Sequence, residues 1–248
     1  RSAPPLALSA VDLLIRNAGG THALKLAATP PASWGERFSI EGSFTQPRLV
    51  PGTLGTGGFT AAGDWSTWSG AATTNWPRID VAQLRQYVNL PFEVTSGRGS
   101  LKTWLEVVQG SLVGAKADVS LSDVDVRLAQ DLAPLDIQSL QGRLVAKRTP
   151  AGGESDTTLA FEGLTFTTKD GQSWPRGDVR VLLQGSPRQP SGGELHAQGI
   201  DLSVLSLVAT RLPLAANIRS LLAQIKPQGH ADAFMATLSA STKISTDM

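Results

Sequence analysis

The chain has 248 residues, of which 41% are apolar and only 17% are charged, below the roughly 25% of charged residues usual in soluble globular proteins. Its formal net charge is +1, which gives no electrostatic footprint for nucleic acid or for an anionic membrane surface. The absence of cysteine excludes disulfides, thiolate catalysis and Cys-based metal sites.

The sequence starts at Arg1 and has neither a signal peptide nor an apolar run of about 18 residues. We therefore expect an internal part of a longer polypeptide that neither targets itself nor spans a bilayer.

Short apolar runs separated by Gly, Pro and Asn predict strands and turns in the first third of the chain. Residues 11–26 predict two strands joined by a turn near Gly19, because glycine supplies the positive φ of a tight turn. Residues 38–44 predict a third strand. Residues 47–75, rich in Gly, Thr, Ser and Trp, predict short strands with irregular connections.

Beyond Pro77, Asp80 is predicted to cap a short helix over residues 81–87. Strand alternation then returns from Gly97, and apolar residues alternate over residues 113–121. The phase of this alternation reverses at Ser122-Asp123, which predicts a bulge or bend within one long strand rather than a loop. Further strands are predicted over residues 140–147, 157–167, 179–184 and 194–198.

The last quarter of the chain predicts helices again. Asp201 is expected to cap a helix through Val208, a second helix is expected over residues 215–225, and a final strand over residues 231–238. Ile79-Asp80-Val81 resembles Ile200-Asp201-Leu202 at an offset of roughly 120 residues, as either a structural repeat or a coincidence.

The predicted fold class is mainly β: a long, curved antiparallel sheet that forms an open hydrophobic groove, with a few short amphipathic helices. We expect an N-terminal β segment (1–76), a short helix with a groove-forming β-meander (77–199), and two short helices with a terminal strand (200–248). These segments are expected to form one continuous, elongated unit.

Residues with catalytic chemistry are not clustered in the sequence. His22, His196 and His230 are isolated and are interpreted as structural. Asp118, Asp123 and Asp125 are interpreted as the solvated side of a strand rather than a calcium or acid–base site. The glycine-rich stretches 55–58 and 97–99 lack the Lys-Ser/Thr of a phosphate loop and are interpreted as turns. We expect no enzyme activity, no cofactor and no metal.

Tryptophan is abundant, with six Trp against one Tyr. Core packing or coverage of sheet edges is the favoured interpretation of Trp34, Trp65, Trp68 and Trp76, although Trp also suits surfaces that are partly apolar and partly wet. A glycan-binding β domain that uses Trp65, Trp68 and Trp76 is a more distant alternative.

Several phrases of this sequence occur in an order that resembles the YhdP family of large AsmA-like (TamB/AsmA-related) envelope proteins. They cover most of residues 34–238 and contain no catalytic motif. The matching phrases are residues 76–91, 97–105 and 132–144, Gly163-Leu164-Thr165-Phe166, Asp170-Gly171, Trp174-Pro175, Gly193-Glu194-Leu195, Ile200-Asp201-Leu202 and Leu212-Pro213.

The resemblance implies a protein anchored in the Gram-negative inner membrane by an N-terminal helix absent here, with a periplasmic β-structure that reaches toward the outer membrane. It also implies passage of phospholipid along a hydrophobic groove and a part in outer-membrane permeability. The expected partners are phospholipid acyl chains and adjoining segments of the same protein, with no nucleic acid.

An apolar strand face can cover an acyl chain while the other face stays polar. The candidate lining residues are Val113, Ala115, Ala117, Val119, Leu121, Val124, Val126, Leu128, Leu159, Phe161 and Leu164. An ordinary β core would produce the same alternation. The alternative function is a structural or assembly module that pairs with partners through exposed strand edges.

Overall fold

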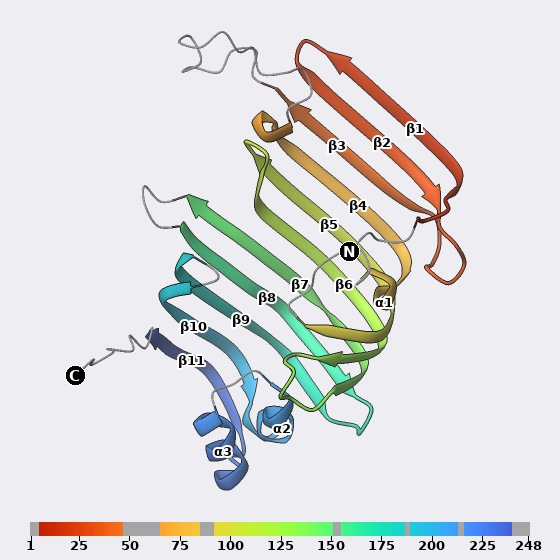
Figure 1. Cartoon of the computed structure of the whole chain (residues 1–248). Helices are drawn as coiled ribbons and strands as arrows, with labels where there is room; N and C mark the ends of the chain where they lie inside the picture. The colour runs from red at the N-terminus through yellow and green to blue at the C-terminus, as the bar shows by residue number, and fades with distance from the viewer. Residues whose placement is uncertain are drawn as a thin grey trace, which may run out of the picture.

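The structure is a computed structural model that describes residues 5–46, 65–84, 92–150, 155–186, 189–212 and 216–239. These residues form one antiparallel sheet of eleven strands, which curves along its length (Figure 1). The predicted class, a long curved antiparallel sheet with few short helices, is confirmed. The strands are β1 (Ser9–Ala18), β2 (Thr21–Thr29), β3 (Phe38–Thr45), β4 (Ser69–Asp80), β5 (Glu93–Val108), β6 (Ser111–Arg127), β7 (Leu135–Pro150), β8 (Ser155–Thr168), β9 (Ser173–Ser186), β10 (Gln189–Asp201) and β11 (His230–Ser239).

The strand order in the sheet is the order in the sequence, from β1 at one edge to β11 at the other. The first hairpin turns at Gly19 and Gly20, both with positive φ, as the sequence predicted. Odd-numbered strands end at what we call the upper rim, the end of the sheet that carries this turn and the β5–β6 turn. Even-numbered strands end at the lower rim, where the helices lie (Figure 1).

The register places apolar or small uncharged side chains in rows that cross the sheet on one face, here called the inner face. One row contributes a residue from every strand: Leu13, Leu26, Ile40, Thr74, Thr103, Ala117, Leu144, Phe161, Val179, Ala197 and Phe234. The next row contains Ile15, Leu24, Gly42, Ala72, Leu105, Ala115, Ala146, Leu159, Val181 and Leu195. Neither row contains a charged residue, as expected when strand alternation gives the sheet two different faces.

Irregularities of pairing line up across β4 to β9 and form a crease in the sheet, and Gly199, with positive φ, continues it into β10. In β6, Asp123 has a φ of 54°, and the apolar phase reverses there within one continuous strand, which confirms the predicted bend. Corresponding register shifts occur in β4 between Trp76 and Ile79, in β5 near Ser96 and in β8 near Leu164. Because the phase changes at the crease, apolar residues stay on the inner face on both sides of it.

Two glycines show why the crease needs residues without a side chain. A Cβ at Gly99 in β5 would lie 2.0 Å from the carbonyl oxygen of Ser120 in β6. Gly199 in β10 has a φ of 68°, and a Cβ there would lie 3.0 Å from the carbonyl oxygen of Arg176. The neighbouring backbones therefore approach more closely than a side chain would permit.

The helices are short and follow strands that end at the lower rim. Helix α1 (Val81–Leu84) follows β4, while α2 (Leu202–Val208), the 3₁₀ helix η2 (Ala209–Arg211) and α3 (Ala216–Ile225) lie between β10 and β11. Asp201 Oδ1 accepts hydrogen bonds from the N–H groups of Ser203 and Val204, at 2.9 and 3.1 Å. Asp80 Oδ1 accepts one from the N–H of Ala82, at 3.1 Å. Both predicted caps are confirmed. The two similar sequence segments at Ile79 and Ile200 therefore share the same local structure, a helix start capped by Asp.

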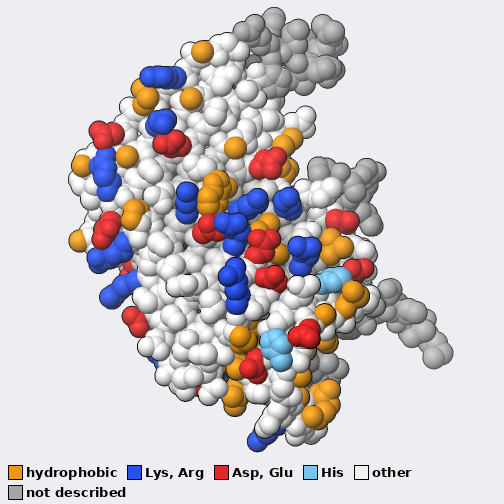
Figure 2. Space-filling view, turned by 180° about the vertical axis from the view of Figure 1, so that it is seen from behind, with side chains coloured by type: hydrophobic (Ala, Val, Ile, Leu, Met, Phe, Trp, Pro, Cys, Tyr) orange, Lys and Arg blue, Asp and Glu red, His pale blue; other side chains and the backbone are white. Residues whose placement is uncertain are grey.

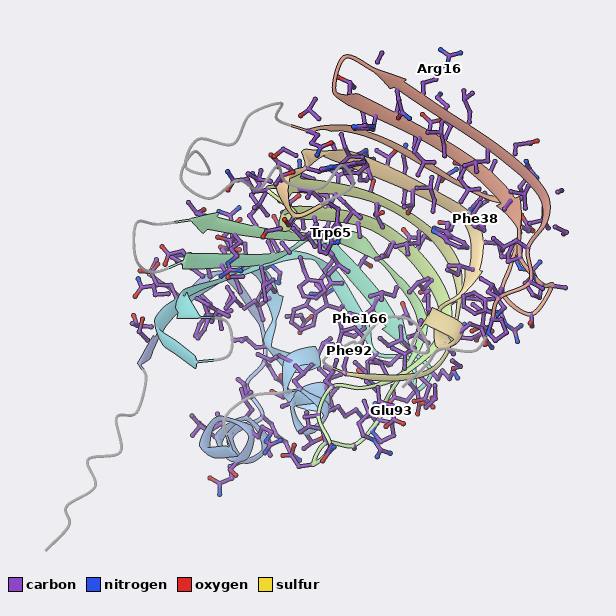
Figure 3. All side chains as sticks on the ribbon, turned by 45° about the horizontal axis from the view of Figure 1, so that its top comes forward. Arg16, Phe38, Trp65, Phe92, Glu93 and Phe166 are labelled. Carbon is purple, nitrogen blue, oxygen red and sulfur yellow. The ribbon has the colours of Figure 1, made fainter. Side chains whose placement is uncertain are left out.

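The hydrophobic core lies below the crease, where α2 covers the inner face. Val204 and Val208 of α2 are 7% and 1% exposed. They belong to one buried cluster with residues of β5 to β10, among which Phe166 is stacked on Trp174. Figure 3 shows Phe166 in the hollow of the curved sheet, beside the helices. The full cluster is Val94, Val124, Val126, Leu135, Ile137, Phe166, Trp174, Ala197, Ile200, Val204 and Val208.

Several element predictions differ from the structure. β4 continues through Pro77 to Asp80, beyond residue 75 where the predicted strands ended; the proline lies at the register shift between Trp76 and Ile79, where the ladder can dispense with an N–H. Residues 97–99 lie within β5, so their interpretation as a turn is wrong. The expected segment boundaries after residues 76 and 199 fall inside β4 and β10. Predictions for residues 47–64 and 85–91 lie outside the described residues.

Candidate functional site

The inner face above the crease is an open apolar surface. Leu159 and Phe161 of β8 are 41% and 43% exposed, and Phe234 of the edge strand β11 is 48% exposed. These side chains belong to the same rows as the half-buried Ala115 and Ala117. We call this surface, the inner face between the crease and the upper rim, the upper trough.

The predicted lining residues fall into two groups. Ala115, Ala117, Val119, Leu159 and Phe161 lie in the upper trough, whereas Val113 lies at a register shift between β5 and β6 and has no strand partner among the described residues. Val124 and Val126 are buried in the core under α2, and Leu121, Leu128 and Leu164 pack against that core. The sequence alternation could not separate the two groups, because it does not show which part of a strand a helix covers.

The other face of the sheet, here called the outer face, carries the charged side chains. One outer row runs Lys25, Glu41, Thr73, Trp104, Lys116, Val145, Ala160, Arg180 and His196. Figure 2 shows Lys and Arg together with Asp and Glu gathered over the middle of the molecule as seen from behind. The two faces therefore differ in chemistry over the whole width of the sheet.

An ion pair between β6 and β7 is the best-defined contact of the outer face. Arg143 Nε and Nη2 donate to the two carboxylate oxygens of Asp118, at 2.6 and 3.0 Å. The hydrogen bond from Arg143 lowers the pKa of the Asp118 carboxyl below its usual range. Arg143 and Lys102 also lie over the ring of Trp104, as cations do over indole faces.

A polar hollow of about 1170 Å³ lies on the outer face across β6 to β10. Its wall includes Arg143, Glu162, Arg180 and His196, and the buried Ala160 lies among them. His196 Nε2 lies 3.0 Å from Glu194 Oε2. Acids and bases are mixed along this wall, so the hollow has no single charge preference.

The acidic group is spread out in the structure. Asp118 pairs with Arg143, Asp123 lies at the crease, and Asp125 lies opposite Ser96 on β5. Among the described residues, no group of three His, Cys, Asp or Glu is placed to hold a metal ion.

The tryptophans of the first third occupy three different environments. Trp34 is buried, Trp76 stacks on Phe38 with ring centroids 4.0 Å apart, and Trp68 stacks on His22 at 4.4 Å. Trp65 in the 3₁₀ helix η1 (Trp65–Thr67) is 70% exposed at the upper rim. Trp65, Trp68 and Trp76 therefore do not form one common stacking platform for a glycan.

These observations define a class of protein: an open antiparallel β-trough with a largely apolar inner face, a charged outer face and one end closed by helices. The family model described as YhdP protein matches residues 4–248, and the chain belongs to this family. Membership indicates an AsmA-like protein of the Gram-negative cell envelope.

The other comparisons give no match, either among curated proteins or among solved structures. Within the described ranges, no helix combines the length and the apolar character required to cross a membrane.

Proposed function

We propose that this chain is a segment of a bridge-like lipid-transport protein, and that its upper trough holds phospholipid acyl chains on their way between the inner and outer membranes. It would act from the periplasmic side, by passive sliding and without catalytic residues. The observation that carries the proposal is the row of uncharged, mainly apolar residues from Leu13 to Phe234, with exposed apolar side chains above the crease.

Energetics support an apolar ligand for this surface. Leu159, Phe161 and Phe234 are each more than two-fifths exposed, although large contiguous apolar patches are rare on soluble proteins and mark sites of contact. Burying apolar surface yields about 25 cal/mol per Å², so an acyl chain lying across the rows would be held without any specific polar contact. Such binding permits sliding, because neighbouring rows offer similar contacts.

Two adjacent residues on β11 test the proposal with a matched control. Phe234 pairs with Ala197 on the inner face, and Met235 pairs with His196 on the outer face. We expect Phe234→Asp to lose phospholipid that co-purifies with the chain, whereas Met235→Asp retains it, as measured by native mass spectrometry with lipid extraction. Val181→Asp and Leu182→Asp on β9 form a second inner and outer pair.

A lipid-free wild-type chain, or equal loss of lipid in the inner and outer variants of both pairs, would contradict the proposal. Circular dichroism of each variant separates loss of lipid from loss of the fold.

The exposed edge strand β1 favours a second candidate, a structural module that assembles through its strand edges. All ten residues of β1 are exposed, including Leu13 at 59% and Ile15 at 58%, and β1 pairs only with β2 among the described strands. An apolar edge of this kind is a template for strand addition. The partner would be an adjoining segment of the same protein.

Light scattering after size-exclusion chromatography tests this candidate. A lipid-free chain that dimerises, and becomes monomeric on Leu13→Lys with Ile15→Lys, would favour assembly over transport. A monomeric chain that carries phospholipid would favour transport.

A further inference from the structure

An exposed apolar corner lies at the upper rim, where η1 meets the β5–β6 turn. Trp65 is 70% exposed, and Val108 and Leu112 on either side of the turn are 43% and 54% exposed. Figure 3 labels Trp65 at this rim, and Figure 1 shows η1 beside the turn. We call Trp65, Val108 and Leu112 the apolar corner.

Hydrogen bonds and a close backbone approach hold the apolar corner in a defined conformation. The turn residues Gln109 and Gly110 both have positive φ, 49° and 68°, as in the tight turns of β-hairpins. The Gly110 N–H donates to the carbonyl oxygen of Trp68 at 2.8 Å, and the Gln109 N–H donates to Ser69 Oγ at 3.0 Å. A Cβ at Gly110 would lie 2.5 Å from Ser66 Cα. The exposed side chains are therefore presented on a closely packed base.

A hollow of about 730 Å³ lies on the outer face directly below the corner, and Val108 contributes to both. Its charged lining consists of three cations, Lys116, Arg143 and Lys147, against one acid, Glu106. Arg143 is engaged by Asp118, whereas Lys116 and Lys147 have no ion-pair partner among the described residues. The near-neutral net charge of the chain conceals this local excess of cations.

We propose that the apolar corner and the lysines below it rest on an anionic phospholipid surface. Trp65, Val108 and Leu112 enter the interfacial region, where an indole suits the boundary between apolar and wet layers. Lys116 and Lys147 face the headgroup phosphates. The charge excess beside an exposed apolar cluster favours an anionic membrane over a protein groove. This contact goes beyond acyl-chain binding and does not depend on it, because the corner lies at the tip of the rim, beyond the rows of the upper trough, and the two lysines lie on the outer face.

Flotation of the purified chain with phosphatidylcholine vesicles, with and without about 30 mol% phosphatidylglycerol, tests the inference. We expect binding that requires the anionic lipid and weakens as salt screens the lysines. Lys116→Gln with Lys147→Gln should weaken binding about fivefold for each lysine. Trp65→Ser with Val108→Ser and Leu112→Ser should weaken it at least about tenfold.

The matched control is Leu207→Ser with Ile225→Ser, which removes two other exposed apolar side chains, 58% and 63% exposed, from α2 and α3. Unchanged flotation in this control is expected. Absence of flotation by the wild-type chain, equal loss in the control, or full binding by either corner or lysine variant would overturn the inference.

The Phe234→Asp variant distinguishes membrane contact by the apolar corner from lipid binding in the upper trough. It should lose co-purifying lipid yet still float with anionic vesicles, so the two proposals fail independently.

Discussion

The two halves of the sheet use the same strand alternation for different purposes. Below the crease, apolar residues of β5 to β10 are buried with Val204 and Val208 of α2 into a closed core. Above the crease, the same face of the same strands leaves Leu159 and Phe161 more than two-fifths exposed. The lower half therefore supplies the stability that allows the upper half to remain open.

The crease itself is the most sensitive feature of this division. Gly99→Val would place Cβ 2.0 Å from the carbonyl oxygen of Ser120, so the backbone of β5 or β6 must move. We expect the free energy of unfolding to fall by about 4 kcal/mol or more, as measured by urea denaturation.

Gly171→Ala is the control, because no atom lies within 4 Å of the added Cβ and only its φ of 85° opposes the change. This substitution should lower the free energy of unfolding by about 1 kcal/mol. Equal losses would contradict a close approach at the crease.

Large-to-small substitutions compare the two halves directly. Ile137 is 4% exposed below the crease and Leu159 is 41% exposed above it. Ile137→Ala should lower the free energy of unfolding by about 3 kcal/mol, and Leu159→Ala by about 1 kcal/mol because little buried contact is lost. Similar losses in urea denaturation would show that the upper trough is as closed as the core.

The N-terminal caps of α1 and α2 can be compared in the same way. Asp201 accepts two backbone hydrogen bonds and Asp80 accepts one. Asp201→Ala should therefore lower stability by about 1.5 kcal/mol and Asp80→Ala by less than about 1 kcal/mol, with Asn variants at both positions close to wild type. A larger loss at Asp80 would mean that α1, rather than α2, stabilises the closed half.

The smallest effect is expected on the outer face, at Asp118. Its pKa is lowered by the hydrogen bond from Arg143, so the folded state binds a proton less readily than the unfolded state. The stabilisation is present above the unfolded carboxyl pKa and is lost as the pH falls through the lower folded pKa. Because both side chains are more than a third exposed, Asp118→Asn should cost less than about 1 kcal/mol near neutral pH.

Thermal denaturation across pH checks this effect. The difference between wild type and Asp118→Asn should shrink as the pH falls below about 4. A difference that grows at low pH would contradict the assigned direction.

Local signals in the sequence predicted much of the fold, because alternation and caps depend on near neighbours. The phase reversal at Asp123, the Asp201 cap and the first hairpin turn were all readable in this way. The continuation of β4 through Pro77 was not readable, because β4 can contain a proline there only as a result of a register shift against β5. Residues 97–99 form part of a strand because the close approach of β6 requires glycine, which is a tertiary requirement.

The candidate site was only partly predictable for a related reason. The apolar face was visible as alternation, but the crease and α2 decide which residues of that face remain open. Val124 and Val126 carry the same pattern as Ala115 and Ala117 and lie in the closed core. The apolar corner was invisible in the sequence, because η1 meets the β5–β6 turn only when β4 pairs with β5.

The sequential order of the strands also has a consequence for how the molecule opens. Each strand pairs only with its neighbours in the chain, so stability propagates from strand to strand, as in repeat proteins. The edge strand β1 can detach with the loss of its pairing with β2 and of the Asp12–Arg37 ion pair, whereas β5 to β10 are held together by the core under α2. Amide exchange should therefore be fastest in β1 and slow progressively toward β6, a gradient of local opening along one sheet.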